Sequence, residues 1–118
     1  MTWKVIFHDD FAREVMEMEK GIRKELIGKI HLLEEFGPEL KRPHADTLKG
    51  SKYANMKELR FEVKNTVWRV AYAFDPRRQA ILLAVGMKQG RNEKRFYERL
   101  LTLADRRYAD HLYKLGKG

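Results

Sequence analysis

Four cationic side chains interrupt the apolar pattern of predicted β-strands in the middle of the chain: Lys57, Arg60, Arg69 and Lys88. An unpaired charge is costly to bury, so such positions need a counter-ion or a ligand. Arginine makes bidentate contacts to phosphate oxygens and stays protonated, and it can stabilise negative charge that develops on a phosphate. The four residues therefore indicate either a phosphate-binding face or salt bridges to Glu58 and Glu62, and the spacing alone favours neither.

Cleavage of RNA by its own 2′-hydroxyl is one reaction that needs little more than such a face. The substrate supplies the nucleophile, while the protein orients it and stabilises charge on the phosphate. The reaction can proceed without a metal ion if a Lys, His or Tyr side chain moves the protons.

Metal and nucleotide chemistry find little support in the sequence. The four histidines lack the short spacings of a metal site, and no cysteine is present to complete one. The glycines of "GSK" and "GMKQG" do not form a Walker loop. We therefore predict no bound metal and no cofactor.

Three strands are predicted from two-residue alternation, over residues 57–63, 67–74 and 80–88. Each strand has one bulky apolar face, which in the third strand is formed by Ile81, Leu83, Val85 and Met87. The opposite face carries small residues beside the cations. We expect that face to be the floor of a shallow groove, too small to form a second core, with Lys57, Arg60 and Arg69 standing on it.

Further elements are predicted on both sides of these strands. Residues 2–7 form a strand, and Asp9 or Asp10 caps a helix that breaks near Gly21 and is followed by a second helix ending at the "FGP" of residues 36–38. A short strand lies near Thr47 and Leu48. A last helix starts near Asn92 and ends in a frayed tail over residues 113–118. The class is α+β, with an N-terminal strand and helical hairpin packed on an antiparallel sheet.

Length and charge suggest one domain over residues 1–118 with a polyanionic partner. The net charge is +8, but residues 1–40 carry 6 Lys/Arg and 9 Asp/Glu, whereas residues 41–118 carry 19 and 8. Neither a signal peptide nor an apolar run of membrane-spanning length is recognised. We expect a cytoplasmic protein without a membrane partner.

Three segments resemble the HigB-like branch of the RelE/ParE toxin superfamily: "RPHADTLKGSKYANMKELRF", "VWRVAYAFDPRRQAILLAVGMKQG" and "EKRFYERLLTLADRRYADHL". The resemblance implies a toxin of a type II toxin–antitoxin system, with a RelE/ParE-like fold. It also implies a ribosome-dependent, metal-independent mRNA endonuclease that cleaves by 2′-hydroxyl attack.

The resemblance also implies roles for individual residues. Arg60, Arg69 and Lys88 would be catalytic, and RNA or ribosome binding would fall to Lys57, Lys49, Tyr97 and His44. The implied partners are a cognate helix-turn-helix antitoxin and the ribosome with bound mRNA, and DNA would be contacted only through the antitoxin. Two alternatives stay open: a ParE-type inhibitor of DNA gyrase, and an inactive relative that acts as a binding module.

Overall fold

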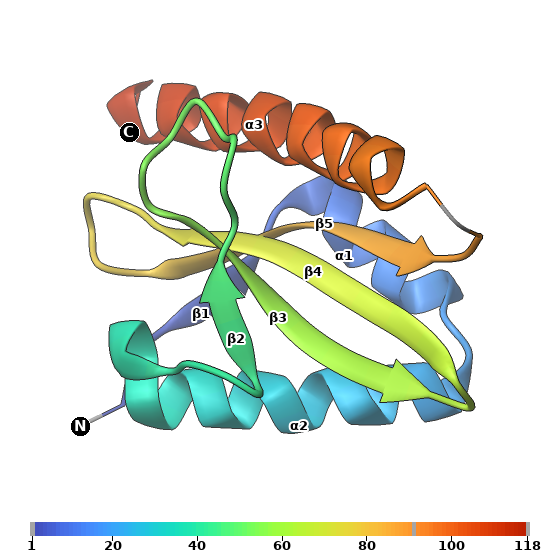
Figure 1. Cartoon of the computed structure of the whole chain (residues 1–118). Helices are drawn as coiled ribbons and strands as arrows, with labels where there is room; N and C mark the ends of the chain where they lie inside the picture. Colours follow the sequence, from blue (N-terminus) through green and yellow to red (C-terminus); the bar gives the residue numbers. More distant parts are fainter. Residues whose placement is uncertain (1, 91, 118) are drawn as a thin grey trace.

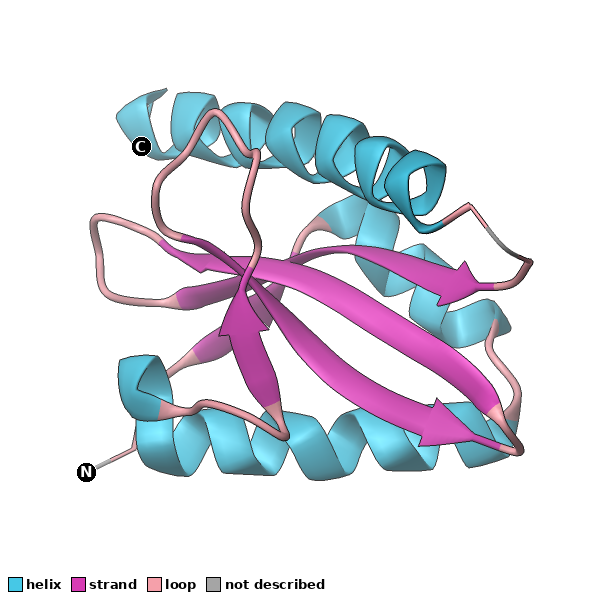
Figure 2. Cartoon of the chain, viewed as in Figure 1, coloured by secondary structure: helices cyan, strands magenta, loops and turns pink. Residues whose placement is uncertain are grey.

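A five-stranded sheet with the order β1-β5-β4-β3-β2 lies between helices on its two faces (Figures 1 and 2). The structure is a computed structural model that describes residues 2–90 and 92–117. The strands are β1 (Val5–Phe7), β2 (Ala45–Thr47), β3 (Met56–Val63), β4 (Thr66–Phe74) and β5 (Ala80–Lys88). The helices are α1 (Asp9–Glu17), α2 (Lys20–Phe36), the short 3-10 turn Gly37–Glu39, and α3 (Glu93–Lys117). The α+β class and the three central strands are confirmed.

The sheet is antiparallel except at one edge. β2, β3, β4 and β5 pair antiparallel with their neighbours, while β1 joins β5 in parallel. The β3–β4 hairpin turns at Lys64 and Asn65, both with positive φ, as a type I′ turn requires. β2 pairs only with residues 57–59 of β3, so the end of β3 extends beyond its neighbour.

Each face of the sheet has its own core. α1 and α2 pack Phe11, Leu26 and Leu33 against Leu59 and Tyr72. On the other face α3 packs Leu100, Ala104 and Tyr108 on Met56, Ala71, Ala73, Ile81 and Ala84, so the expectation that the small-residue face could not form a second core is wrong. Alanines leave the space that a helix with larger side chains fills, and α3 provides those side chains.

A β-bulge changes the face assignment of β5. The pairing moves from Ala71 with Ala84 to Tyr72 with Leu82, which leaves Leu83 as the extra residue. Ile81 and Leu83 therefore lie under α3, whereas Val85 packs on the α2 side. The prediction of one continuous face from Ile81 to Met87 is wrong, because strict alternation fails wherever a residue is inserted.

Helix ends differ from the predictions at three points. His8, not an aspartate, caps α1, because its Nδ1 accepts the backbone N–H of Asp10. The break between α1 and α2 falls at Met18 and Glu19, and Gly21 lies within α2. α3 continues through Lys117 where a frayed tail was expected, with Leu112 packed against its core; Gly118 is outside the described residues.

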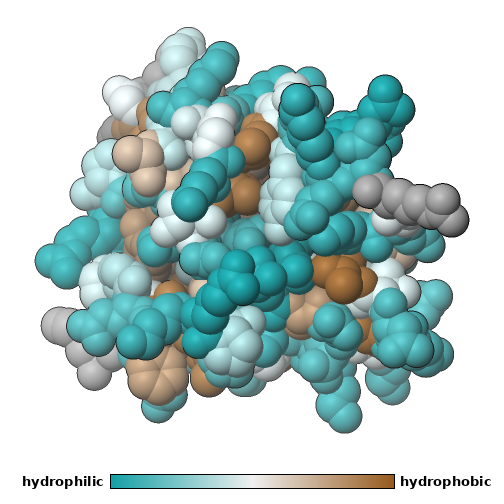
Figure 3. All heavy atoms as spheres, in the orientation of Figure 1, coloured by the Kyte–Doolittle hydropathy of each residue, from teal (hydrophilic) through white to brown (hydrophobic). Residues whose placement is uncertain are grey.

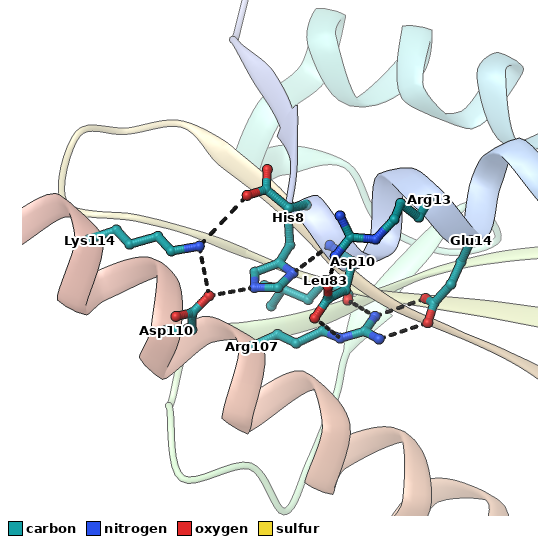
Figure 4. Close-up of polar contacts among 9 residues, drawn as sticks. His8, Asp10, Arg13, Glu14, Leu83, Arg107, Asp110 and Lys114 are labelled. Atoms are coloured by element: carbon teal, nitrogen blue, oxygen red, sulfur yellow. Dashed lines mark hydrogen bonds and ion pairs between the residues drawn. The ribbon is translucent and has the colours of Figure 1, made fainter.

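Polar contacts join α3 to α1 across the edge of the sheet (Figure 4). Arg107 donates from Nη1 and Nη2 to the two carboxylate oxygens of Glu14, at 2.8 and 2.7 Å, and from Nη1 to the carbonyl of Leu83. His8 donates from Nε2 to Asp110 at 2.8 Å, since its Nδ1 is already an acceptor. These contacts fix the rotation of α3, and with it the residues that α3 presents to the sheet.

Within residues 2–90 and 92–117, none of the helices combines the length and the apolar character needed to cross a lipid bilayer.

Candidate phosphate-binding site

Arg60 and Arg69 lie opposite each other on β3 and β4, and a single buried carboxylate lies between them. Glu58, only 3% exposed, accepts a hydrogen bond from Arg60 Nη1 to Oε2 at 2.6 Å. Its other oxygen, Oε1, is 3.8 Å from Nε of Arg69. The alternative of salt bridges is therefore realised at Glu58, which also holds the two guanidinium groups side by side. Glu62 is exposed near the end of the strand and makes neither of these two contacts.

Arg69 is held by α3 as well as by the sheet. Its Nε donates to the hydroxyl of Tyr97 at 3.2 Å, and its Nη1 donates to the carbonyl of Trp68 at 3.0 Å. The first turn of α3 is placed by Asn92, whose side chain accepts the N–H of Arg95, as predicted for a cap. This turn of α3 packs closely on β5, because a Cβ at Gly86 would lie 2.8 Å from the ring of Phe96, the residue before Tyr97.

A cleft of about 420 Å³ opens beside this pair, with Glu58 and Arg60 in its wall. Lys49 and Tyr97 also line it. Lys49 is brought there by the loop between β2 and β3, which reaches across to α3 (Figure 2), where Ser51 and the backbone of Lys52 donate to Asp105. Three of the predicted site residues, Arg60, Lys49 and Tyr97, therefore share one cleft.

Lys88 does not line that cleft, but its ion-pair partner does. Its Nζ is 3.0 Å from Oε1 of Glu93, and Glu93 lines the cleft. Lys88 lies on the same sheet face as Arg69, because Val67 is its partner on β4 and Arg69 lies two residues further along that strand. A ligand in the cleft would reach Lys88 only if the Glu93 contact opened.

Lys57 and His44 are not in the cleft. Lys57 pairs with Tyr72, a residue of the α2-side core, so alternation directs its side chain away from Arg60; its predicted place on the Arg60 face is wrong. The odd and even positions of one strand point to opposite faces, and 57 is odd. His44 lies at the other end of β2, where its Nδ1 is 2.9 Å from Nζ of Lys29.

Two further charged residues at the cleft were missed from sequence. Arg42 donates from Nε to Asp46 at 2.8 Å, and both line the cleft. The hydrogen bond from Arg42 is the main reason that the pKa of the Asp46 carboxyl lies below its ordinary value, so Asp46 is ionised at neutral pH. Arg42 lies in a turn and Asp46 in the three-residue strand β2, which is too short to show a period in the sequence.

The arrangement suits an anion with several oxygens. A guanidinium has five N–H donors, and the contact with Glu58 uses Nη1 of Arg60, so Nε and Nη2 of Arg60 keep donors for a ligand. Figure 3 shows hydrophilic residues gathered over the middle of the face on which β2 and β3 lie in Figure 1. Among the described residues no group of three or more His, Asp or Glu side chains could hold a metal ion.

Comparison with known proteins agrees with this fold. Residues 13–109 match the family described as "Phage derived protein Gp49-like (DUF891)". The chain belongs to that family, and its relatives confirm the HigB-like branch of the RelE/ParE superfamily that the sequence resembles.

Two relatives come from Mycobacterium tuberculosis. A protein named toxin HigB3 is 42% identical over 103 residues, which cover 87% of this chain and 88% of the relative. One named toxin HigB2 is 47% identical over 85 residues, 70% of this chain but only 41% of that relative. The match therefore spans about two fifths of the longer relative.

A solved structure has the same fold. It is a mutant of E. coli toxin RelE in the free state, with a TM-score of 0.58, 14% identity, and coverage of 86% of this chain and 96% of the other. At that identity the likeness concerns the fold.

Proposed function

We propose that this protein is the toxin of a type II toxin–antitoxin system and cleaves mRNA on the ribosome. The observation that carries the proposal is the pair of arginines held by Glu58. Arg60 lines a cleft together with Lys49 and Tyr97, and Arg69 contacts Tyr97 beside that cleft. Two relatives are named as toxins, which supports the same conclusion.

In the proposed reaction the 2′-hydroxyl of one nucleotide gives up its proton to a base as its oxygen bonds to the adjacent phosphorus. The bond from that phosphorus to the 5′-oxygen of the next nucleotide breaks, and the leaving oxygen takes up a proton, which gives a 2′,3′-cyclic phosphate and a 5′-hydroxyl. Negative charge accumulates on the non-bridging oxygens. In this proposal Arg60 and Arg69 donate to these oxygens, and the contacts of Arg60 with Glu58 and of Arg69 with Tyr97 hold the two side chains in position for it. The nucleophile comes from the substrate, so the reaction requires orientation and charge stabilisation from the protein.

Lys49 and Tyr97 contact the RNA beside the scissile phosphate in this proposal. Lys49 is exposed on the loop rim and supplies a mobile charge for a backbone phosphate. The Tyr97 hydroxyl oxygen accepts a hydrogen bond from Arg69, so the hydroxyl proton of Tyr97 is left to donate toward the cleft. Lys88 joins the catalytic set once substrate displaces Glu93.

The antitoxin proposed as partner would be an acidic-surfaced helix-turn-helix protein. The segment over residues 41–118 carries 19 Lys/Arg against 8 Asp/Glu. Such a surface attracts both ribosomal RNA and an acidic protein patch, and DNA would be contacted through the antitoxin alone.

The test maps RNA 5′ ends in bacteria shortly after induction of the wild type, Arg69→Lys and Arg60→Ala. Lysine keeps the charge of Arg69 but lacks the planar guanidinium that presents a fixed pair of N–H donors to a phosphate, so the variant separates guanidinium geometry from bulk charge. We expect cuts within translated frames for the wild type and a loss of about a hundredfold or more for each variant. Cleavage should also stop when translation is blocked.

Arg13→Ala serves as the matched control, because this exposed arginine of α1 is outside the cleft. Thermal melts of each purified variant establish that it is folded. Intact messages with arrested growth and DNA damage would overturn the proposal in favour of gyrase. Harmless overexpression would favour an inactive relative.

A further inference from the structure

A second basic hollow lies on the other side of Arg60. It has a volume of about 390 Å³ and lies where β3 extends past the end of β2, beyond the bond from the Arg60 N–H to the His44 carbonyl. Its lining comes from both faces of the sheet. Lys29 of α2 and Phe61 lie on one side, Arg69 and Glu62 on the other, and Arg42 at the rim. The hollow therefore wraps around the open edge of β3.

Positive charge dominates this hollow. Four of its lining residues are cations (Lys29, Arg42, Arg60 and Arg69), against one carboxylate, Glu62. Asp46 and Glu58 partly neutralise three of these cations from outside the hollow. The described partner of Lys29 is different: its Nζ lies 2.9 Å from Nδ1 of His44, and an ammonium group has no lone pair, so it can only donate to that nitrogen. The described contact of Lys29 is therefore with an imidazole and not with a carboxylate.

Arg60 and Arg42 line both hollows. A nucleic acid strand with one phosphate at Arg60 and Arg69 has two ways to continue: into the cleft beside Lys49, or over the β3 edge toward Lys29. Both directions offer cations. The placement of these cations on the two sides of Arg60 therefore fits a strand that crosses the edge of the sheet.

We propose that Lys29 and Arg42 form a subsite for the RNA phosphate next to the scissile one. The inference rests on the proposed function for the identity of the strand. It deepens that function by giving the substrate a path from the cleft across β3 to α2. Lys29 and Arg42 act here in binding and take no part in bond breaking.

The experiment measures binding of a short single-stranded RNA with methylated 2′-hydroxyls, which cannot be cleaved, by fluorescence anisotropy at several salt concentrations. Lys29→Ala with Arg42→Ala should weaken binding about tenfold, as expected when a charged hydrogen bond is removed. The slope of log affinity against log salt should become shallower by about 0.7 for each phosphate that the variant no longer binds. Lys24→Ala, an exposed lysine of the same helix outside the hollow, should bind as the wild type does.

A neutral methylphosphonate moved along the RNA one linkage at a time locates the subsite. For the wild type, one linkage should weaken binding when neutralised; in the double variant the same linkage should have no further effect. Additive losses at every linkage, or wild-type affinity in the double variant, would overturn the subsite. Loss of affinity for the antitoxin with RNA binding unchanged would also overturn it.

The two proposals fail in distinguishable ways. Intact messages in induced cells would remove the nuclease while a methylphosphonate-sensitive subsite at Lys29 and Arg42 still stood. Cut messages together with unchanged RNA binding by the double variant would remove only the subsite.

Discussion

At the scale of single residues, one carboxylate organises the proposed site. Glu58 is buried, contacts Arg60 directly and lies 3.8 Å from Nε of Arg69. Its Oε1 has no hydrogen-bond partner among the described residues. A buried acceptor without a donor is costly, and the charge of the Arg69 guanidinium 3.8 Å away compensates only part of that cost. The unsatisfied Oε1 of Glu58 therefore lowers the stability of the fold, while Glu58 keeps the two guanidinium groups close to each other.

Glu58→Ala should destabilise the fold by about 3 kcal/mol, because removing one partner of a buried ion pair leaves the other uncompensated. Arg60 and Arg69 would then repel each other across the hairpin. Glu58→Gln should cost less, since the amide oxygen still accepts from Arg60. Urea unfolding measures both.

Glu62→Gln is the control for this comparison, with the same chemistry on the same strand face but in an exposed position. Its stability should stay within about 0.5 kcal/mol of the wild type. Equal stability of Glu58→Ala and the wild type would show that the arginines do not depend on the carboxylate.

At the scale of elements, α3 is the part of the fold that the sequence predicted least well. Its start at Asn92 and its apolar stripe were readable, because a cap and a helical period are local signals. Its position was not. Alanines at 71, 73 and 84 looked like the floor of an open groove, and only the tertiary packing shows that they are the seat of a helix. The same packing brings Tyr97 to Arg69.

In the strands, two-residue alternation predicted the side-chain faces correctly in some places and not in others. Alternation correctly placed Arg60 and Arg69 on one face, because both strands are regular there. It failed in β5, where the inserted Leu83 leaves no mark in the sequence. Lys29 and Arg42 could not be associated with the site at all, since a helix and a loop reach the edge of β3 by folding rather than by any repeat.

The anchor of α3 can be tested at Arg107. Arg107→Ala should cost about 2 kcal/mol, because it leaves the buried Leu83 carbonyl without this donor, while the half-exposed Glu14 regains water. Arg106→Ala, its exposed neighbour, should be close to neutral. Guanidinium unfolding of the two variants gives the comparison, and equal stabilities would show that the polar anchor contributes nothing to holding α3.

The β4–β5 turn is tied to α3 through Asp75, and this link should depend on pH. Burial alone would raise the pKa of the Asp75 carboxyl, but hydrogen bonds from His111, from Gln79 and from the backbone of Arg77 outweigh it and leave the pKa below the ordinary value. A carboxyl with a lowered folded pKa stabilises the protein fully above its unfolded pKa of about 3.9. That contribution is lost as the pH falls through the folded value.

Unfolding free energies between pH 3 and pH 6 should therefore decline in acid for the wild type and decline less steeply for Asp75→Asn, which is also less stable at neutral pH. Asp9→Asn, an exposed carboxylate at the start of α1, should keep the wild-type dependence. A wild-type acid slope in Asp75→Asn would assign the pH dependence to other carboxylates.

At the scale of the whole molecule, charge is distributed by layer. Arg95, Arg99 and Arg106 are exposed along α3 and line one hollow together. The first two also line a hollow of about 520 Å³ at the end of β5. The helices at the opposite face come from the N-terminal segment, where acids outnumber bases by 9 to 6. A molecule with such a gradient approaches a polyanion in a preferred orientation, with the α3 side leading.

Replacing Arg95, Arg99 and Arg106 by Gln should weaken association with ribosomes, and the dependence on salt should become shallower by about 0.7 to 0.9 for each phosphate that is no longer bound. A matched triple replacement of Lys20, Arg23 and Lys24 on α2 removes the same three charges, so either variant falls from +8 to +5. Cosedimentation with ribosomes across a salt series separates the two. If position matters, the α3 variant loses affinity and the α2 variant largely keeps it. Equal losses would mean that total charge alone attracts the protein to the ribosome, and the α3 face would then have no orienting role.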